Sequence, residues 1–223
     1  MIKLWIKIIL LISLTNNVYG HQERWDYDKS NWPELLFIVY YGDNSNIVQL
    51  INKNIDCLNN RFGFFNISVL DVAIRVNNTN AVHELLMTKK IIGLDNYLIE
   101  ACLFNSNIEI VKHLYEFGAD INYIDENGYN SIMYAVSFGN KNIMEFLIRQ
   151  NVDVNIGRRI GDGATALTLA IYNLDIEKIM ILLEAGAETN NINNNGETAY
   201  IMAERITKKI DNEKKEQILN LLR

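Results

Sequence analysis

The side chains best suited to metal chemistry are few and scattered. The three histidines are His21, His83 and His113, and the two cysteines are Cys57 and Cys102. Proteins hold metal ions with several His, Cys or carboxylate side chains at close spacing. These five residues lie far apart in the sequence. We therefore expect no metal site and no cofactor.

One segment has enough glycine to suggest a phosphate-binding loop. Residues 157–163 read Gly-Arg-Arg-Ile-Gly-Asp-Gly, but the Lys-Ser/Thr ending of such a loop is missing. The sequence also lacks the Gly-x-Ser-x-Gly nucleophile motif and the His-Glu-x-x-His zinc motif. The adjacent carboxylates of Asp125 and Glu126 fall in a predicted turn, where solvent surrounds them. We expect no catalytic residues and no enzyme activity, with an active site assembled from distant residues as the alternative.

Charge argues against nucleic acid as a partner. The formal net charge is −6, whereas phosphate binding requires a concentrated basic surface. The basic residues near the carboxyl end alternate with acidic ones, which is typical of a solvated helix face. Hydrophobic residues make up 49% of the chain and charged ones 22%, a composition typical of a folded protein and not of a disordered one.

The first twenty residues have the pattern of a secretory signal peptide. Lys3 and Lys7 lie at its basic start, residues 8–14 are mostly apolar, and Val18-Tyr19-Gly20 ends in a small residue before His21. The apolar segment is shorter than the about 20 residues that a membrane span needs. We expect cleavage near Gly20-His21 and export to the periplasm or the medium, with no membrane contact beyond this segment. An uncleaved anchor and a buried first helix are the alternatives.

A short motif that ends in a small residue recurs along the remaining chain. In its regular copies a glycine (Gly128, Gly163 or Gly196) stands seven residues before that small residue. The steps between successive copies are 35, 28, 34, 35 and 33 residues, and such a period indicates stacked structural units. The aligned residues are Ile38, Ala73, Ala101, Ala135, Ala170 and Ala203.

The second half of each unit repeats as well. A pair of large aliphatic residues is followed by a Gly or Asn that can end a helix, and then by a turn of the Asp-x-Asn type. A small residue on one helix and an aliphatic pair on the next predict two closely packed antiparallel helices. The clearest copies are Leu85-Leu86, Leu147-Ile148 and Leu182-Leu183 for the pairs, and 118–122, 151–155 and 186–190 for the turns.

This pattern resembles the ankyrin-repeat family, whose period is about 33 residues and whose signature is Thr-Pro-Leu-His-x-Ala. The chain departs from that signature, because Ser131, Ala166 and Ala199 stand where the proline would be. The resemblance implies an all-α solenoid of stacked antiparallel helix pairs with short β-turn fingers. The domain would span 31–223 after a lead-in at 21–30. Its repeats would lie roughly at 31–61, 62–93, 94–125, 126–160, 161–193 and 194–223, the last as a carboxyl-terminal cap.

The alignment of the repeats, which we call the repeat frame, also gives the positions of the cysteines and of two histidines within their units. Cys57 and Cys102 fall at apolar places of different units, which predicts two buried free thiols in place of a disulfide or a metal site. His83 and His113 fall at matching exposed places of the second helices. Residues 157–163 lie at a junction between units, which predicts a longer finger.

Partners of ankyrin arrays usually contact the concave face of the first helices and the fingers. On this chain the concave places lie two and three residues after each aligned residue. Aromatic and arginine side chains dominate interface hot spots, so we expect the residues at these places to bind a partner. The alternative is that they complete the core, and for Leu103 and Phe104 the choice stays open. The expected concave residues are Tyr40, Tyr41, Arg75, Val76, Leu103, Phe104, Ser137, Phe138, Tyr172 and Asn173, and the expected finger residues are Phe64, Phe65, Tyr129, Arg158 and Arg159.

These features together predict a non-catalytic protein–protein interaction module that is exported. It would act as a monomer or as a subunit of a hetero-complex. A regulatory or accessory subunit of an envelope enzyme, a secreted factor that binds a host protein and a structural spacer are the alternatives. An enzyme is the rival of a different class.

Overall fold

The computed structural model describes residues 34–42, 44–61, 67–138, 140–158, 161–207 and 212–223. The expected signal peptide and lead-in lie outside these residues, as do the finger residues Phe64, Phe65 and Arg159.

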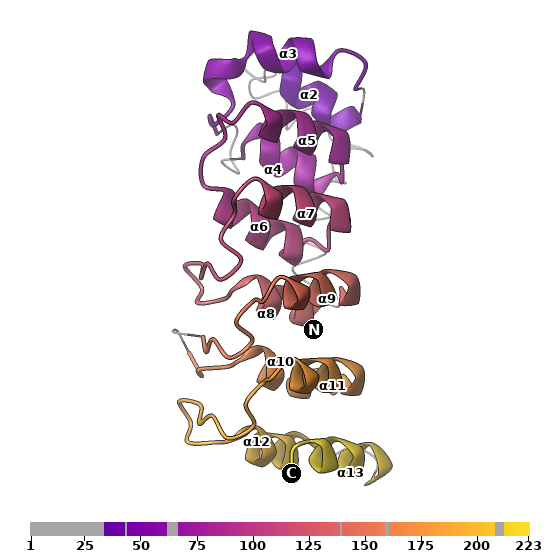
Figure 1. Cartoon of the computed structure of the whole chain (residues 1–223), viewed down its shortest axis with the longest axis vertical. Helices are drawn as coiled ribbons and strands as arrows, with labels where there is room; N and C mark the ends of the chain where they lie inside the picture. Colours follow the sequence, from indigo (N-terminus) through magenta and orange to yellow (C-terminus); the bar gives the residue numbers. More distant parts are fainter. Residues whose placement is uncertain (1–33, 43, 62–66, 139, 159–160, 208–211) are drawn as a thin grey trace, which may run out of the picture.

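Six helix pairs stacked in single file make up the described part of the chain (Figure 1). Each of the six expected repeat ranges contains one pair. The pairs are α2 (Glu34–Tyr41) with α3 (Ile47–Lys53), α4 (Val69–Arg75) with α5 (Thr79–Met87), α6 (Leu94–Leu103) with α7 (Ile108–Glu116), α8 (Ser131–Phe138) with α9 (Lys141–Arg149), α10 (Ala166–Tyr172) with α11 (Ile176–Glu184), and α12 (Ala199–Ile206) with α13 (Asn212–Leu221).

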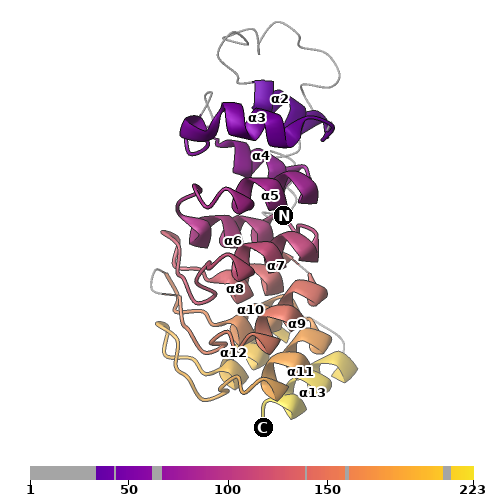
Figure 2. The same cartoon turned by 45° about the horizontal axis from the view of Figure 1, so that its top comes forward.

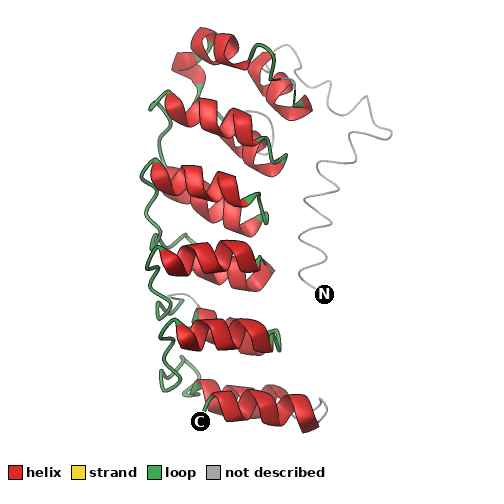
Figure 3. Cartoon of the chain, turned by 45° about the vertical axis from the view of Figure 1, so that its right-hand side comes forward, coloured by secondary structure: helices red, strands yellow, loops and turns green. Residues whose placement is uncertain are grey.

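The helices form two layers along the array. The first helices of successive pairs contact one another in chain order from α2 to α12, and the second helices stack beside them (Figure 2). We call the side of the first helices the concave face, as in ankyrin arrays. The loops that precede the first helices project from one edge of the array (Figure 3).

Side-chain caps fix where many of the helices begin. Ser68 caps α4 in a reciprocal box with Asp71, and Thr165 caps α10 in the same way with Thr168. The second helices α5, α7, α9 and α11 begin instead at an Asn or Asp whose side chain accepts a backbone N–H of the first turn. Such caps satisfy donors that the helix itself leaves unpaired, so these side chains fix the first residues of α4, α10 and four of the second helices.

The recurring small residue packs as the sequence predicts. Ala73, Ala101, Ala135, Ala170 and Ala203 are all 0% exposed, which confirms the close contact between the helices. Leucines of the second helices fill the space between repeats, and Leu85, Leu114, Leu147 and Leu182 are equally buried.

The left-handed ends of the second helices also agree with the sequence. Gly118, Asn151 and Gly186 follow α7, α9 and α11 with φ of 101°, 59° and 87°, a conformation that Gly and Asn adopt at low cost. At the carboxyl end, α13 buries Ile218 and Leu219, and Leu222 is buried directly after it. The expected cap is therefore present.

Two predictions from the repeat frame are wrong. Cys57 is exposed and only Cys102 is buried, because Cys57 lies in a short 3-10 helix (Ile55–Cys57) after α3 and not on a packed face. His83 and His113 are half-buried, and their rings lie 5.0 Å apart between α5 and α7. They do not match in the repeat: His83 directly follows the buried Val82, whereas His113 comes two residues after the buried Val111.

Candidate functional site

The expected concave residues lie at the carboxyl ends of the first helices, but only two are widely exposed. Tyr41 ends α2 and Tyr172 ends α10, with 66% and 70% of their surface exposed. Tyr40 is half-buried and packs edge-on against Tyr41, with ring centroids 5.1 Å apart. Asn173, the carboxyl cap of α10, is half-buried. Tyr41 and Tyr172 belong to the first and fifth helix pairs and therefore form separate patches.

Phe104 and Arg75 form one unit between the second and third repeats. The Arg75 guanidinium carbon lies 4.9 Å from the centroid of the Phe104 ring, a cation–π arrangement. The same guanidinium donates from Nη2 to Glu100 Oε1 at 3.3 Å. The arginine therefore covers part of Phe104, a residue for which the sequence left binding and completion of the core both open.

Phe138 belongs to a ladder of three aromatic rings on α8 and the finger before it. Its ring stacks on Tyr134 at 6.1 Å, and Tyr134 in turn lies 5.0 Å from Tyr129. The Tyr134 hydroxyl donates to Asp125 Oδ2 at 2.7 Å, and burial, together with this carboxylate, raises the pKa of Tyr134. Phe138 is half-buried, so it contributes both to the core and to the concave face.

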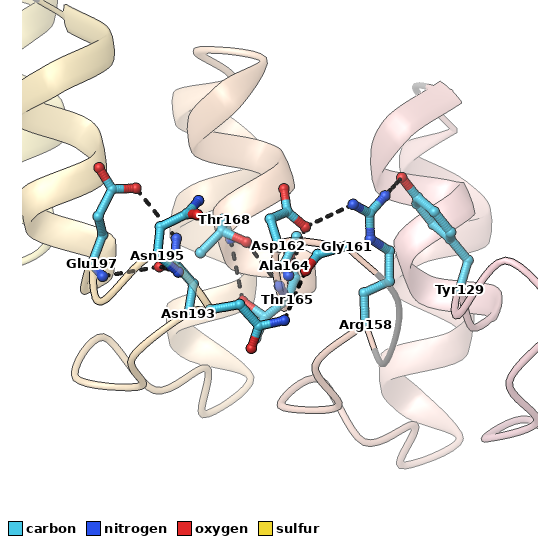
Figure 4. A network of polar contacts seen from close by, with 11 residues as sticks. Tyr129, Arg158, Gly161, Asp162, Ala164, Thr165, Thr168, Asn193, Asn195 and Glu197 are labelled. Atoms are coloured by element: carbon cyan, nitrogen blue, oxygen red, sulfur yellow. Dashed lines mark hydrogen bonds and ion pairs between the residues drawn. The ribbon is translucent and has the colours of Figure 1, made fainter.

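Tyr129 and Arg158 join the fourth and fifth fingers. Arg158 donates from Nη1 to the Tyr129 hydroxyl at 2.7 Å and from Nη2 to Asp162 Oδ1 at 2.8 Å (Figure 4). The guanidinium also lies 5.1 Å from the centroid of the Tyr129 ring. Asn194 of the sixth finger continues this network, since its side chain donates to the Gly161 carbonyl at 2.8 Å. Three fingers are thus tied edge to edge.

The fourth and sixth fingers share a turn whose signature is Asx-x-Asn-Gly. In the fourth finger Asp125 Oδ1 accepts the N–H groups of Asn127 and Tyr129, at 2.9 and 2.8 Å. In the sixth, Asn193 Oδ1 accepts the corresponding groups of Asn195 and Glu197. The glycine that follows, Gly128 or Gly196, has a φ of 80° or 76°, which favours glycine.

The fifth finger is the longer one that the sequence predicts. Its closing backbone bond runs from Arg158 N–H to the Ala164 carbonyl, six residues on. The corresponding bonds of the other two fingers join Asp125 to Tyr129 and Asn193 to Glu197, four residues on. The two extra residues account for the step of 35 between Ala135 and Ala170, against 33 for the next.

A second connection between repeats was not predicted from the sequence. Asn122 Oδ1 accepts the Asp153 N–H at 2.8 Å, and Asn155 Oδ1 accepts the Glu188 N–H at 2.9 Å. Both asparagines end an Asp-x-Asn turn, and the recurrence of that asparagine was the available signal. These side-chain-to-backbone bonds connect the turn after α7 with the turn after α9, and that turn with the one after α11.

Within the described ranges no group of three or more His, Cys, Asp or Glu side chains could hold a metal ion. Nor does any helix in the described part of the chain have the length and apolar character needed to cross a membrane.

Comparison with known families matches this geometry. The family model for ankyrin repeats (three copies) matches residues 70–158 and 132–206, which together span more than half of the chain. The chain belongs to the ankyrin-repeat family. The ankyrin fold is generally a scaffold for protein–protein interaction, and this match indicates no catalytic family.

Relatives of the array occur in viruses and bacteria. Ankyrin repeat protein FPV031 of fowlpox virus is 32% identical over 105 residues, 46% of this chain and 30% of its own length. An ankyrin repeat protein of Rickettsia bellii is 30% identical over 138 residues, 58% of this chain and 19% of its own length. The chain therefore spans less than a third of the length of these curated relatives.

A solved structure shows the same fold. The ankyrin repeat domain of Bcl-3, a member of the IkappaB protein family, superposes with a TM-score of 0.73 at 17% sequence identity. The superposition covers 87% of this chain and 86% of that domain.

Proposed function

We propose that this ankyrin array is an exported, non-catalytic adaptor that binds another protein through its concave face and finger edge. The observation that carries the proposal is Tyr172, which ends the first helix of the fifth pair and has 70% of its surface exposed. Tyrosine gives a large contact area for little lost side-chain freedom, which is why it is enriched at interface hot spots.

The finger network supports the same proposal. Arg158 is held by Tyr129 and Asp162, and Asn194 is held by Gly161. Loops that are already ordered lose little conformational entropy when a partner binds. The bonded residues of the fourth to sixth fingers therefore offer a preorganised edge.

Site-specific photocrosslinking tests where the partner binds. A photoreactive amino acid placed at Tyr172 reports on the concave face. The same group at Met87, which ends a second helix and is 54% exposed, is the matched control. We expect a discrete crosslinked protein from position 172 and none from position 87. Equal labelling at both positions would contradict the proposed surface.

Export rests on the first twenty residues alone. The basic start, the apolar segment 8–14 and the Val18–Gly20 exit support cleavage before His21. A periplasmic accessory subunit and a secreted factor both fit an exported array. Mass spectrometry of the protein from its native source should find His21 at the amino terminus. Recovery of the intact Met1 form from soluble cytosol would overturn this part of the proposal.

A further inference from the structure

Two carboxyl groups meet at the contact between α4 and α6. Asp71 lies in the first turn of α4, and Glu100 lies on α6 within hydrogen-bonding reach of it. The Asp71 side chain is only 1% exposed and that of Glu100 is 24% exposed. Two neighbouring carboxylates away from water repel each other strongly, so this pair requires a compensating interaction.

Among the residues that the structure describes, two of the four carboxyl oxygens lack a donor. Asp71 Oδ2 accepts the Ser68 N–H and lies 3.4 Å from Arg61 Nη1. Glu100 Oε1 accepts from Arg75 at 3.3 Å. Asp71 Oδ1 and Glu100 Oε2 are both buried and unpartnered. An unpaired buried acceptor is costly. Burial keeps side chains of other proteins away from these two oxygens. A proton bound to one of them would let that oxygen donate a hydrogen bond to the other.

The charged and titratable groups beside the pair are Arg61, Arg75 and Tyr97 of α6, whose hydroxyl shares a hydrogen bond with Ser68. The charges that act on Glu100 are those of Asp71 and Arg75, both on α4. The neighbouring helix α8 has no charged residue. On α7, the other neighbour, Lys112 is paired with Glu109 in an exposed salt bridge.

We propose that Asp71 and Glu100 share one proton in the folded protein at neutral pH, and that this proton makes the junction between the second and third repeats sensitive to pH. The proton lies between Asp71 Oδ1 and Glu100 Oε2 and supplies the missing hydrogen bond. Arg61 and Arg75 flank the pair and pair with its outer oxygens.

The electrostatics of Glu100 agree with this arrangement. Burial, and then the neighbouring Asp71 carboxylate, raise the pKa of Glu100 to about 8, from an ordinary value of 4.5. Between these two values the folded protein binds more protons than the unfolded chain. Its stability is therefore highest below the lower value, falls as pH rises toward the upper one, and is constant above it.

The site also links pH to the concave face. Arg75 pairs with Glu100 and covers Phe104, and both Arg75 and Phe104 are expected partner-binding residues. Loss of the proton adds a negative charge beside that arginine. The proposal does not depend on a partner, and its tests use the isolated protein.

Carboxyl NMR measures the proton directly. In ¹³C-labelled protein the Glu100 carboxyl should titrate near pH 8, more than three units above an exposed glutamate. Glu100→Gln assigns the signal. A Glu100 midpoint between 4 and 5 would overturn the proposal, whatever the fate of the variant.

Thermal melts measure the consequence for the fold. Between pH 5 and 8 the folding equilibrium constant of the wild type should fall by up to about tenfold per pH unit, as expected for one proton. Glu100→Gln retains a donor for Asp71 and should flatten this dependence. The control Glu204→Gln, at an exposed glutamate of α12, should keep the wild-type slope. Identical slopes in all three proteins would contradict the shared proton.

Discussion

The buried ammonium group of Lys178 should be worth more to the fold than its surface counterparts. Its side chain is only 9% exposed. Nζ donates to the Val136 carbonyl at 2.8 Å and lies 3.2 Å from Asp175 Oδ2. One cation thus connects α11 of the fifth repeat with α8 of the fourth.

Lys178→Met removes the charge and keeps most of the aliphatic chain. The Val136 carbonyl loses a charge-assisted hydrogen bond, which contributes about 1.5–3 kcal/mol. Asp175 loses its counter-ion, but one third of its side chain is exposed, so water offsets much of that loss. Relief from burying an ammonium group offsets a further part. We expect a net loss of about 2 kcal/mol in the free energy of unfolding.

Urea melts followed by circular dichroism provide the assay, with the midpoint compared at constant m-value. The matched control is Lys112→Met on α7, where the ion pair with Glu109 is exposed. Solvent screens such a pair, so the control should leave the midpoint almost unchanged. Equal losses in both variants, or a more stable Lys178→Met, would refute the reasoning from burial.

Three further predictions concern packing, the fingers and the thiols. Ala170→Leu should overpack the fully buried contact between α10 and α11 at a cost of about 1–3 kcal/mol in the same melts, and an unchanged midpoint would show a looser contact. Tyr129→Phe removes the acceptor for Arg158. It should speed amide hydrogen exchange in the fifth finger and change the stability of the whole fold little. Unchanged exchange would mean that the backbone alone orders the finger. The exposed Cys57 should react with a thiol reagent in the folded protein. The buried Cys102, whose pKa is raised by burial, should not react. Rapid reaction of both would show that the third repeat opens.

Sequence reasoning found the architecture because the architecture is periodic. The aligned alanines and the glycines before them recur at intervals that only a stack of similar units explains, and all five alanines are fully buried. The longer fifth finger followed from the same alignment. Such features depend on backbone spacing, which the sequence records directly.

How far neighbouring side chains shield each concave residue from solvent could not be predicted in the same way. Arg75 lies over Phe104, a residue 29 positions later in the next repeat, and the half-burial of Phe138 depends on Tyr134 one helical turn before it. These contacts depend on side-chain conformations that the repeat frame does not specify. Cys57 lies in a unit whose motif is degenerate, where the frame is weakest.

The affinity of Tyr172→Ala for the crosslinked partner, measured together with its melt, tests the binding surface most directly. Tyr172 is 70% exposed, so the variant should unfold at the wild-type midpoint. Removal of a hot-spot tyrosine side chain should weaken binding by about 2 kcal/mol or more, which is about a thirtyfold increase in Kd. Full affinity in a variant of unchanged stability would contradict binding through the concave face.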